Sequence, residues 1–411
     1  MKRIRHILLA ATAFVLLAGC VYDDYADVAD PADEQLFVTL LLHVGTVVPT
    51  RGADTPSAEL MHSLRIVLVD ADKNSVEYNT LIDQNNSDLF GSGDNGVDEL
   101  DYSKFRIIRT VPGRKKIFLI ANEESTRSVN GVAGQSLTDL LDSKPAGASD
   151  FETLVNGIWF TPDFDNRLIL SANYDFEIGQ SSLGGEVRKE FWLVHAATKF
   201  DFRFENHCPN TIRIDELNLS QLAGTSGTGD MYLLANLATS ERDKTYEGTS
   251  YYWIEWLRRV CDETTANPED PDNTNINERY GWISDYVLPA GVDHTVVDIK
   301  DRVGESADAF WEIATGESLS LNNIYCSESK YAAGGADQEY AFSVKLINTE
   351  ARVGDDDRER EFLDNRLDHV KALFRNTHVK ITVSVKQDLE LELRIGVCPW
   401  VEQEIEIPPF D

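Results

Sequence analysis

Apolar and polar residues alternate in short runs along most of the chain. One face of the first run, at residues 36–44, carries only apolar side chains: Leu36, Val38, Leu40, Leu42 and Val44. Alternation with a period of two is typical of a β-strand that buries one face. The same pattern predicts strands at 64–69, 104–108, 115–122, 167–170, 190–194, 198–205, 212–219, 231–234, 340–347, 378–386, 390–397 and 401–407. The chain is therefore predicted to be all-β.

Helical signals are few and short. Residues 137–141 and 151–155 are each predicted to form one or two turns of helix. A longer amphipathic helix on a sheet edge is predicted further on, because four apolar residues have helical spacing: Leu363, Leu367, Val370 and Phe374. The polar stretch 262–279 predicts a long loop.

The chain is expected to divide near residues 186–196. A turn-rich stretch at 180–185 precedes a renewed strand pattern at 191–194. A length of 411 residues is enough for two or three domains. We predict one domain at 52–190 and a second at 191–411.

The N-terminus has the pattern of an export signal. Three basic residues precede an apolar stretch at 7–17, which is too short to span a bilayer. The following Leu17-Ala18-Gly19-Cys20 resembles a bacterial lipoprotein signal, which implies removal of residues 1–19 and lipid on Cys20. An ordinary secretory signal with a chance cysteine is the alternative. No later stretch is long and apolar enough for a membrane-spanning helix, and the acidic segment after Cys20 is typical of a solvated tether.

The composition argues against several classes of function. Seventy acidic and 38 basic residues give a net charge of −32, so we expect no nucleic-acid partner, because too little positive charge is present to neutralise phosphates. The nucleophile elbow, the zinc-protease helix motif and the phosphate-binding glycine loop do not occur. The sequence thus predicts a protein that is not an enzyme and has no catalytic residue, cofactor or metal site.

Four cysteines remain after Cys20, namely Cys208, Cys261, Cys326 and Cys398. None forms a Cys-x-x-Cys pair, so zinc and thioredoxin-like sites are not indicated. An exported protein permits disulfides, and four cysteines allow three pairings. Disulfides and buried thiols both remain open.

Several motifs together resemble the fimbrillins, the major and minor subunits of Bacteroidetes-type (type V) pili. The first strand ends in Thr50-Arg51-Gly52-Ala53, and a second motif is the strand ending at 117–122. The C-terminal pattern 373–383 is followed by Val-Cys-Pro-Trp at 397–400. Residues 194–199 look like the start of the family's second domain, although His195 stands where the family suggests arginine.

The resemblance implies a fold of two tandem transthyretin-like β-sandwiches and an assembly mechanism. An arginine-specific protease would cut between Arg51 and Gly52 and release residues 20–51 with the first strand. A neighbouring subunit would then supply its C-terminal strand by β-strand addition. The inward residues of that donor strand would be Val401, Gln403, Ile405 and Ile407. The expected partners are other fimbrial subunits, the maturation protease and the outer membrane, and the expected location is a cell-surface fimbria that supports adhesion.

Three alternatives stay open. If Arg51 is not cut, the chain keeps its lipid and would be an anchor subunit at the pilus base. The last strand could instead pair within its own domain. A monomeric surface lipoprotein could bind glycan or host protein through aromatic residues, for which the candidates are Tyr251, Tyr252, Trp253 and Trp256.

Overall fold

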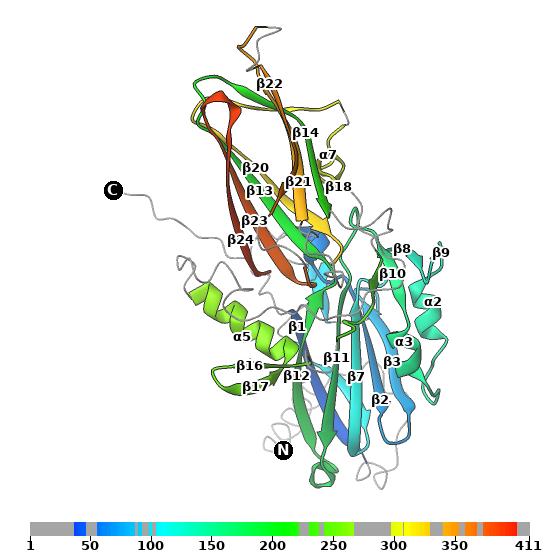
Figure 1. Cartoon of the computed structure of the whole chain (residues 1–411). Helices are drawn as coiled ribbons and strands as arrows, with labels where there is room; N and C mark the ends of the chain where they lie inside the picture. Colours follow the sequence, from blue (N-terminus) through cyan, green and yellow to red (C-terminus); the bar gives the residue numbers. More distant parts are fainter. Residues whose placement is uncertain are drawn as a thin grey trace, which may run out of the picture.

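The computed structural model describes residues 37–46, 56–86, 89–92, 98–100, 104–221, 230–237, 242–266, 297–306, 308–328, 340–352, 358–367 and 373–400. Within these ranges strands predominate, and three of the four α-helices have six residues or fewer. The predicted all-β class is confirmed. Strands β1–β12 form one half of the molecule and most of the later strands form the other (Figure 1).

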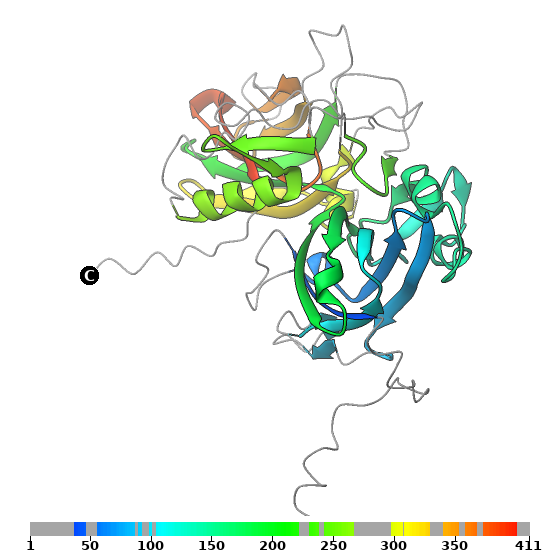
Figure 2. The ribbon, with the colours of Figure 1, turned by 90° about the horizontal axis from the view of Figure 1, so that it is seen from below.

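A seven-stranded sheet in the order β3-β2-β7-β11-β12-β1-β6 organises the first half. Its strands are β1 (Val38–Thr46), β2 (Ser63–Asp70), β3 (Ser75–Asp83), β6 (Arg106–Thr110), β7 (Gly113–Ala121), β11 (Leu170–Ile178) and β12 (Glu186–His195). Leu42 of β1 and Leu64 of β2 line the same cavity although their strands are four positions apart. The sheet therefore curls into two facing layers around one core, as the view from below shows (Figure 2).

The outer face of β2 and β7 is covered by a third layer. The helices α2 (Leu137–Asp142) and α3 (Phe151–Asn156) confirm the two short helices that the sequence predicted. The Ser136 hydroxyl caps α2 by accepting from Asp139 N at 3.0 Å. A small sheet completes this layer in the order β15 (Met231–Tyr232), β10 (Trp159–Pro162), β8 (Thr126–Val129) and β9 (Val132–Ala133). Because β15 pairs with β10, a segment from the second half of the sequence belongs to the first half of the structure.

The second half is a β-sandwich. One sheet has the order β20 (Ser318–Cys326), β13 (Thr198–Asn206), β23 (Thr377–Val385) and β24 (Leu391–Pro399). The other has the order β18 (Val297–Asp298), β14 (Ile212–Gln221), β21 (Tyr340–Asn348) and β22 (Glu359–Arg366), and β19 (Trp311–Ile313) also pairs with β14. The rings of Phe202 on β13 and Phe342 on β21 make an edge-to-face contact with their centres 6.1 Å apart, which joins the two sheets through their buried faces.

Smaller elements complete the described fold. The strands β4 (Phe90–Ser92) and β5 (Asp98–Leu100) form a hairpin, and α7 (Ile299–Arg302) follows β18 directly. A second hairpin of β16 (Asp243–Tyr246) and β17 (Thr249–Tyr252) leads into α5 (Trp253–Ala266). Its Tyr252 hydroxyl donates to Asn173 O of β11 at 2.9 Å, so this hairpin packs against the first half.

Some sequence expectations were wrong. The helical stripe expected from residue 363 begins inside strand β22, where Leu363 is 64% exposed at a sheet edge. Pairing with β21 decided that segment, since helical spacing of a few apolar residues is a weaker constraint than a sheet ladder. The loop expected from residue 262 begins inside α5, and β11 starts where the strand predicted at 167–170 ends.

The domain boundaries remain a prediction, although residues 190 and 191 both lie within β12. The strand predicted at 401–407 lies outside the described residues.

Candidate functional site

The first strand occupies a fitted position inside the first half. The side chains of Val38, Leu40 and Leu42 are at most 1% exposed, and that of Val44 is 6% exposed. The alternation predicted for this strand is thus confirmed from residue 38 onward, while Leu36 lies outside the described residues. β1 places its apolar face in the core and leaves its other face half-buried.

Backbone pairing holds β1 along both of its edges. It runs parallel to β12, with Thr39 opposite Glu186 and Thr46 opposite Leu193. It runs antiparallel to β6, with Val38 opposite Thr110. A strand in this position satisfies the hydrogen-bonding groups of two neighbours. Its removal would leave a groove with two unpaired walls and an apolar floor.

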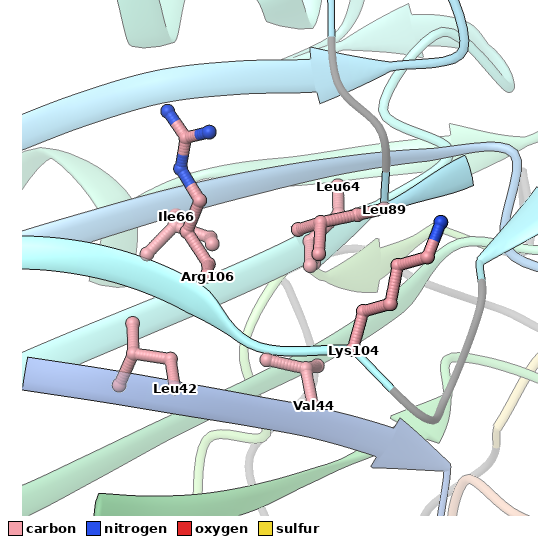
Figure 3. Close-up of a pocket in the computed structure, with 7 residues that line it drawn as sticks. All are labelled: Leu42, Val44, Leu64, Ile66, Leu89, Lys104 and Arg106. Atoms are coloured by element: carbon pink, nitrogen blue, oxygen red, sulfur yellow. The ribbon is translucent and has the colours of Figure 1, made fainter. Parts of the chain in front are cut away.

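A small cavity remains at one end of the groove. Its lining combines apolar side chains from β1, β2 and the β4 region with two cationic side chains: Leu42, Val44, Leu64, Ile66, Leu89, Lys104 and Arg106 (Figure 3). The Arg106 guanidinium donates to the Tyr78 hydroxyl through Nη2 at 2.9 Å. Packing of β1 is therefore less complete around Val44 than around Leu40.

The outward face near β1 is partly apolar. Phe105 and Ile107 are 40% and 45% exposed. The Arg188 guanidinium of β12 lies 5.7 Å from the centre of the Phe105 ring, and Arg109 lies 5.8 Å from that of Phe37. This face therefore mixes aromatic and guanidinium groups rather than carrying charge alone.

A second site joins the two halves, and we call it the junction cluster: Glu59, His195, Lys199, Tyr325, Asn376 and Trp400. Glu59 belongs to the short 3-10 helix η2 (Ser57–Glu59). Its carboxylate accepts from Lys199 Nζ at 3.0 Å and from the Tyr325 hydroxyl at 2.6 Å. All three residues are buried, so a charged pair from opposite halves is enclosed in the core.

Trp400 lies at the centre of the junction cluster and is fully buried. Its ring stacks on His195, the last residue of β12, at 4.4 Å, and on Tyr325 at 5.7 Å. Lys199 Nζ lies 5.3 Å from the ring centre. Trp400 N donates to Asn376 O at 2.9 Å, which fixes the backbone beyond the end of β24.

His195 links the cluster in two directions. Its Nε2 lies 3.2 Å from Glu59 O, and its Nδ1 lies 3.2 Å from Asn376 Oδ1. The backbone N–H of His195 also donates to Asn376 Oδ1 at 3.1 Å. Histidine therefore fits the position at which the fimbrillin pattern suggested arginine, because imidazole can both stack and hydrogen-bond there.

A buried arginine next to the cluster also crosses between the halves. Arg375 forms a bidentate ion pair with Glu328, in which Nη2 donates to Oε1 at 2.6 Å and Nε donates to Oε2 at 3.1 Å. The same guanidinium donates to Tyr232 O at 2.7 Å and to Leu233 O at 3.1 Å. Full burial of both charges is tolerated because the guanidinium has several acceptors and a carboxylate partner.

The buried His378 and the half-buried Asp201 form a pair near the cluster, and the pKa values of both are shifted. Burial lowers the pKa of His378 and outweighs the attraction of Asp201, whose carboxylate lies 2.8 Å away. Burial alone would raise the pKa of Asp201, but the hydrogen bond and charge of His378 lower it. Both shifts favour the deprotonated forms of these groups in the folded chain.

The remaining sites that the sequence predicted stay predictions. Cys20, Arg51 and Gly52, and the donor residues Val401, Gln403, Ile405 and Ile407, lie outside the described residues.

The aromatic candidates for a surface binding site are mostly interior. Trp253 and Trp256 are 2% and 0% exposed, and Trp253 meets Phe374 edge-on at 5.3 Å. Tyr251 and Tyr252 are half-buried. The tryptophans are therefore core residues of α5.

Cys208 and Cys326 are buried thiols, and burial raises the pKa of Cys326 to about 12. A thiol with such a pKa is unreactive at neutral pH. Among the described residues, no group of three or more His, Cys, Asp or Glu side chains could hold a metal ion. Within the same residues, no helix has the length and apolar character needed to cross a bilayer.

The junction cluster was not predicted as a site, although four of its six residues belong to motifs of the family resemblance. Asn376 and Trp400 belong to the C-terminal pattern, and His195 and Lys199 to the second-domain motif. Glu59 carried no signal in the sequence. Only the tertiary structure shows that these residues meet.

No family model matches the sequence, and no curated protein matches it. Similar solved structures include three fimbrial proteins of Porphyromonas gingivalis. The tip fimbrial protein Mfa3, solved with a C-terminal truncation, is 11% identical and aligns over 89% of this chain and 100% of its own, with a TM-score of 0.44. A fimbrilin, FimA of strain W83, is 13% identical over 89% and 99%, with a TM-score of 0.44. The fimbrial anchor protein Mfa2 is 11% identical over 88% and 98%, with a TM-score of 0.31.

Proposed function

We propose that this chain is a structural subunit of a cell-surface fimbria that supports adhesion and polymerises by strand exchange. It is exported as a lipoprotein modified at Cys20 and is cut between Arg51 and Gly52. The cut releases the segment that carries β1. The C-terminal strand of a neighbouring subunit, with Val401, Gln403, Ile405 and Ile407 facing inward, then fills the groove.

The observation that carries this proposal is the position of β1. A nine-residue strand is inserted between β12 and β6 with its apolar face in the core. In sequence it precedes every other described element, so one backbone cut after it would detach it from the chain. A single cut after any later strand would also remove the described elements that precede that strand.

The energetics favour replacement of the strand over an empty groove. Four aliphatic side chains of β1 are buried, and each contributes roughly 1.5–3 kcal/mol by burial. An empty groove would lose this contribution and leave two walls of unpaired backbone groups. The segment Val401–Ile407 offers three aliphatic residues with the same alternation, and its outward residues are glutamates. β-strand addition restores both the backbone pairing and the apolar contacts.

The alternative is a lipid-retained anchor subunit, which differs only in the fate of Arg51. An uncut chain keeps both its lipid and β1, so it cannot accept a neighbour's strand. It could still donate its own C-terminal strand. The buried positions of Trp253 and Trp256 argue against the alternative of a monomeric glycan binder built on these residues.

The test is the N-terminal sequence and mass of the protein sheared from native cells. We expect a start at Gly52 in ladders that resist detergent. The variant Arg51→Lys keeps the charge but removes the arginine-specific site, so it should remain uncut and unpolymerised. A lipidated Cys20 start with no cut form would refute the polymerising role and leave the anchor subunit or a monomeric lipoprotein.

A further inference from the structure

We infer that Trp400 and the junction cluster fix the root of the C-terminal segment, by which we mean the backbone at Trp400, where the residues beyond β24 begin. Tension on that segment then passes directly into β12, the wall of the groove. The fixed root is a property of the single chain. Its mechanical consequence rests on the proposed function, because tension arises only when the segment beyond Trp400 is held by a neighbour.

The end of β24 is a weak point without such a fixed root. β24 pairs with β23 in antiparallel register, and Pro399 opposite Thr377 is the last pair. A pull on residue 401 would therefore act on the end of a ladder. Ladder pairs that are loaded from one end open one after another, and each net hydrogen bond is weak. A large buried side chain directly after the last pair prevents the first of these steps.

Trp400 has contacts suited to this role. Its ring stacks with those of His195 and Tyr325, and the Lys199 ammonium group lies 5.3 Å from its centre. Its backbone N–H is bonded to Asn376 O, and Asn376 N is bonded to Ala197 O at 2.7 Å. The residue is therefore held by its ring and by its backbone at the same place.

These contacts lead into the first half. His195 is the last residue of β12, and β12 pairs with β1 as far as Leu193, opposite Thr46. The distance along the strand from the groove wall to the stacked ring is thus two residues. In an assembled fibre, the strand held in the groove would pair along β12 as far as Leu193, and the strand that leaves at Trp400 would act on its last residue, His195.

The start of the cut chain is fixed in the same cluster. Glu59 lies eight residues after Arg51 in sequence, and its carboxylate holds Lys199 and Tyr325 of the second half. Leu168 N donates to Ala58 O at 2.8 Å, which binds the η2 segment to the first half. The cut therefore leaves both the new N-terminal segment and the root of the C-terminal segment attached to one buried site.

The root is tested first in the uncut monomer, with Arg51→Lys as the background. In Trp400→Ala we expect amide hydrogen exchange at Ile395–Val397 to accelerate by roughly ten-fold or more, because loss of a buried aromatic contact favours local opening. Exchange near Leu391 should change less. The control is Phe204→Ala, since Phe204 is equally buried on β13 but lies toward the opposite end of the same sheet. Equal acceleration along all of β24 in Trp400→Ala, or none, would overturn the inference.

Trp400→Phe keeps the measurement possible if the alanine variant does not fold. The indole N–H has no hydrogen-bond partner among the described residues, so this change removes ring area without breaking a side-chain hydrogen bond. We expect a smaller acceleration confined to the same three amides. An exchange pattern identical to that of the parent chain in both variants would contradict a role for the ring.

The mechanical consequence is tested in fibres. In electron micrographs, fibres of Trp400→Ala or Trp400→Phe should show a shorter persistence length than parent fibres, and those of Phe204→Ala should not. Unchanged bending in both tryptophan variants would refute the transmission of tension through the cluster. If the parent chain forms no fibre, the proposed function fails, and the exchange measurement still decides whether Trp400 fixes the root.

Discussion

A single truncation in β1 separates the precursor from the assembled subunit. Leu40 is fully buried, and it lies opposite Ile108 on β6 and Val187 on β12. Replacement of a buried leucine by alanine costs about 2–5 kcal/mol, because the transfer free energy is lost and a cavity remains. We expect Leu40→Ala to destabilise the uncut chain by about this amount. In assembled fibres the same variant should have no effect, since the strand that contains residue 40 has been released.

The assay compares two forms of the same variants. The uncut form carries Arg51→Lys, and its unfolding by denaturant is followed through tryptophan fluorescence. Dissociation and unfolding of native fibres are followed in the same way. Leu41→Ala, on the half-buried outward face of β1, is the matched control within the strand. Ile66→Ala, in β2, is the positive control, because this core residue is present in both forms.

Two results would refute the reasoning. If Leu40→Ala lowers the unfolding midpoint of fibres as much as Ile66→Ala does, β1 remains in the assembled subunit and is not exchanged. If Leu40→Ala leaves the uncut chain unchanged while Ile66→Ala destabilises it, β1 does not contribute to the core of the precursor. The predicted pattern is a loss in the uncut chain alone.

Three further predictions concern the proposed donor strand, the buried ion pair of Arg375 and Glu328, and the buried His378. Ile405→Asn should abolish detergent-resistant ladders, while Glu404→Gln should leave them intact, because only residue 405 is expected to face the groove; immunoblots of sheared protein measure this. Arg375→Met should lower the free energy of unfolding by about 3–5 kcal/mol, because it leaves the buried carboxylate of Glu328 without its partner. The double variant Arg375→Met with Glu328→Gln should lose less stability, as measured by thermal unfolding. Acidification below about pH 6.5 should destabilise the folded chain through His378, because burial lowers the pKa of this residue and the unfolded chain therefore binds the proton at a higher pH than the folded chain does. His378→Gln should flatten the dependence of Tm on pH in that range. An unchanged slope would contradict the assignment to His378.

The sequence by itself determined the class of fold and the first strand. Alternation of apolar and polar residues is a local property, so it identified eight strands close to their observed bounds: β1, β2, β7, β13, β14, β21, β23 and β24. It did not identify the nine-residue strands β3 and β20. It failed where local patterns were ambiguous. The acidic residues within β11 hid most of that strand. The helical spacing of Leu363 and Leu367 was a coincidence, because Leu363 is exposed on the edge strand β22 and Leu367 is a buried residue directly after it. Pairing with a distant partner decided both segments.

Only the tertiary structure decided where the strands and the buried charges meet. The parallel pairing of β1 with β12 joins residues about 150 positions apart, and no local pattern encodes such a contact. Glu59 and Lys199 look like surface residues in the sequence, because charged side chains are rarely buried unless they are paired. Their burial depends on the approach of the two halves, which places each charge within reach of the other. The buried face of the first strand was therefore predictable from its own alternation, whereas its neighbours β12 and β6 and the junction cluster required the assembled fold.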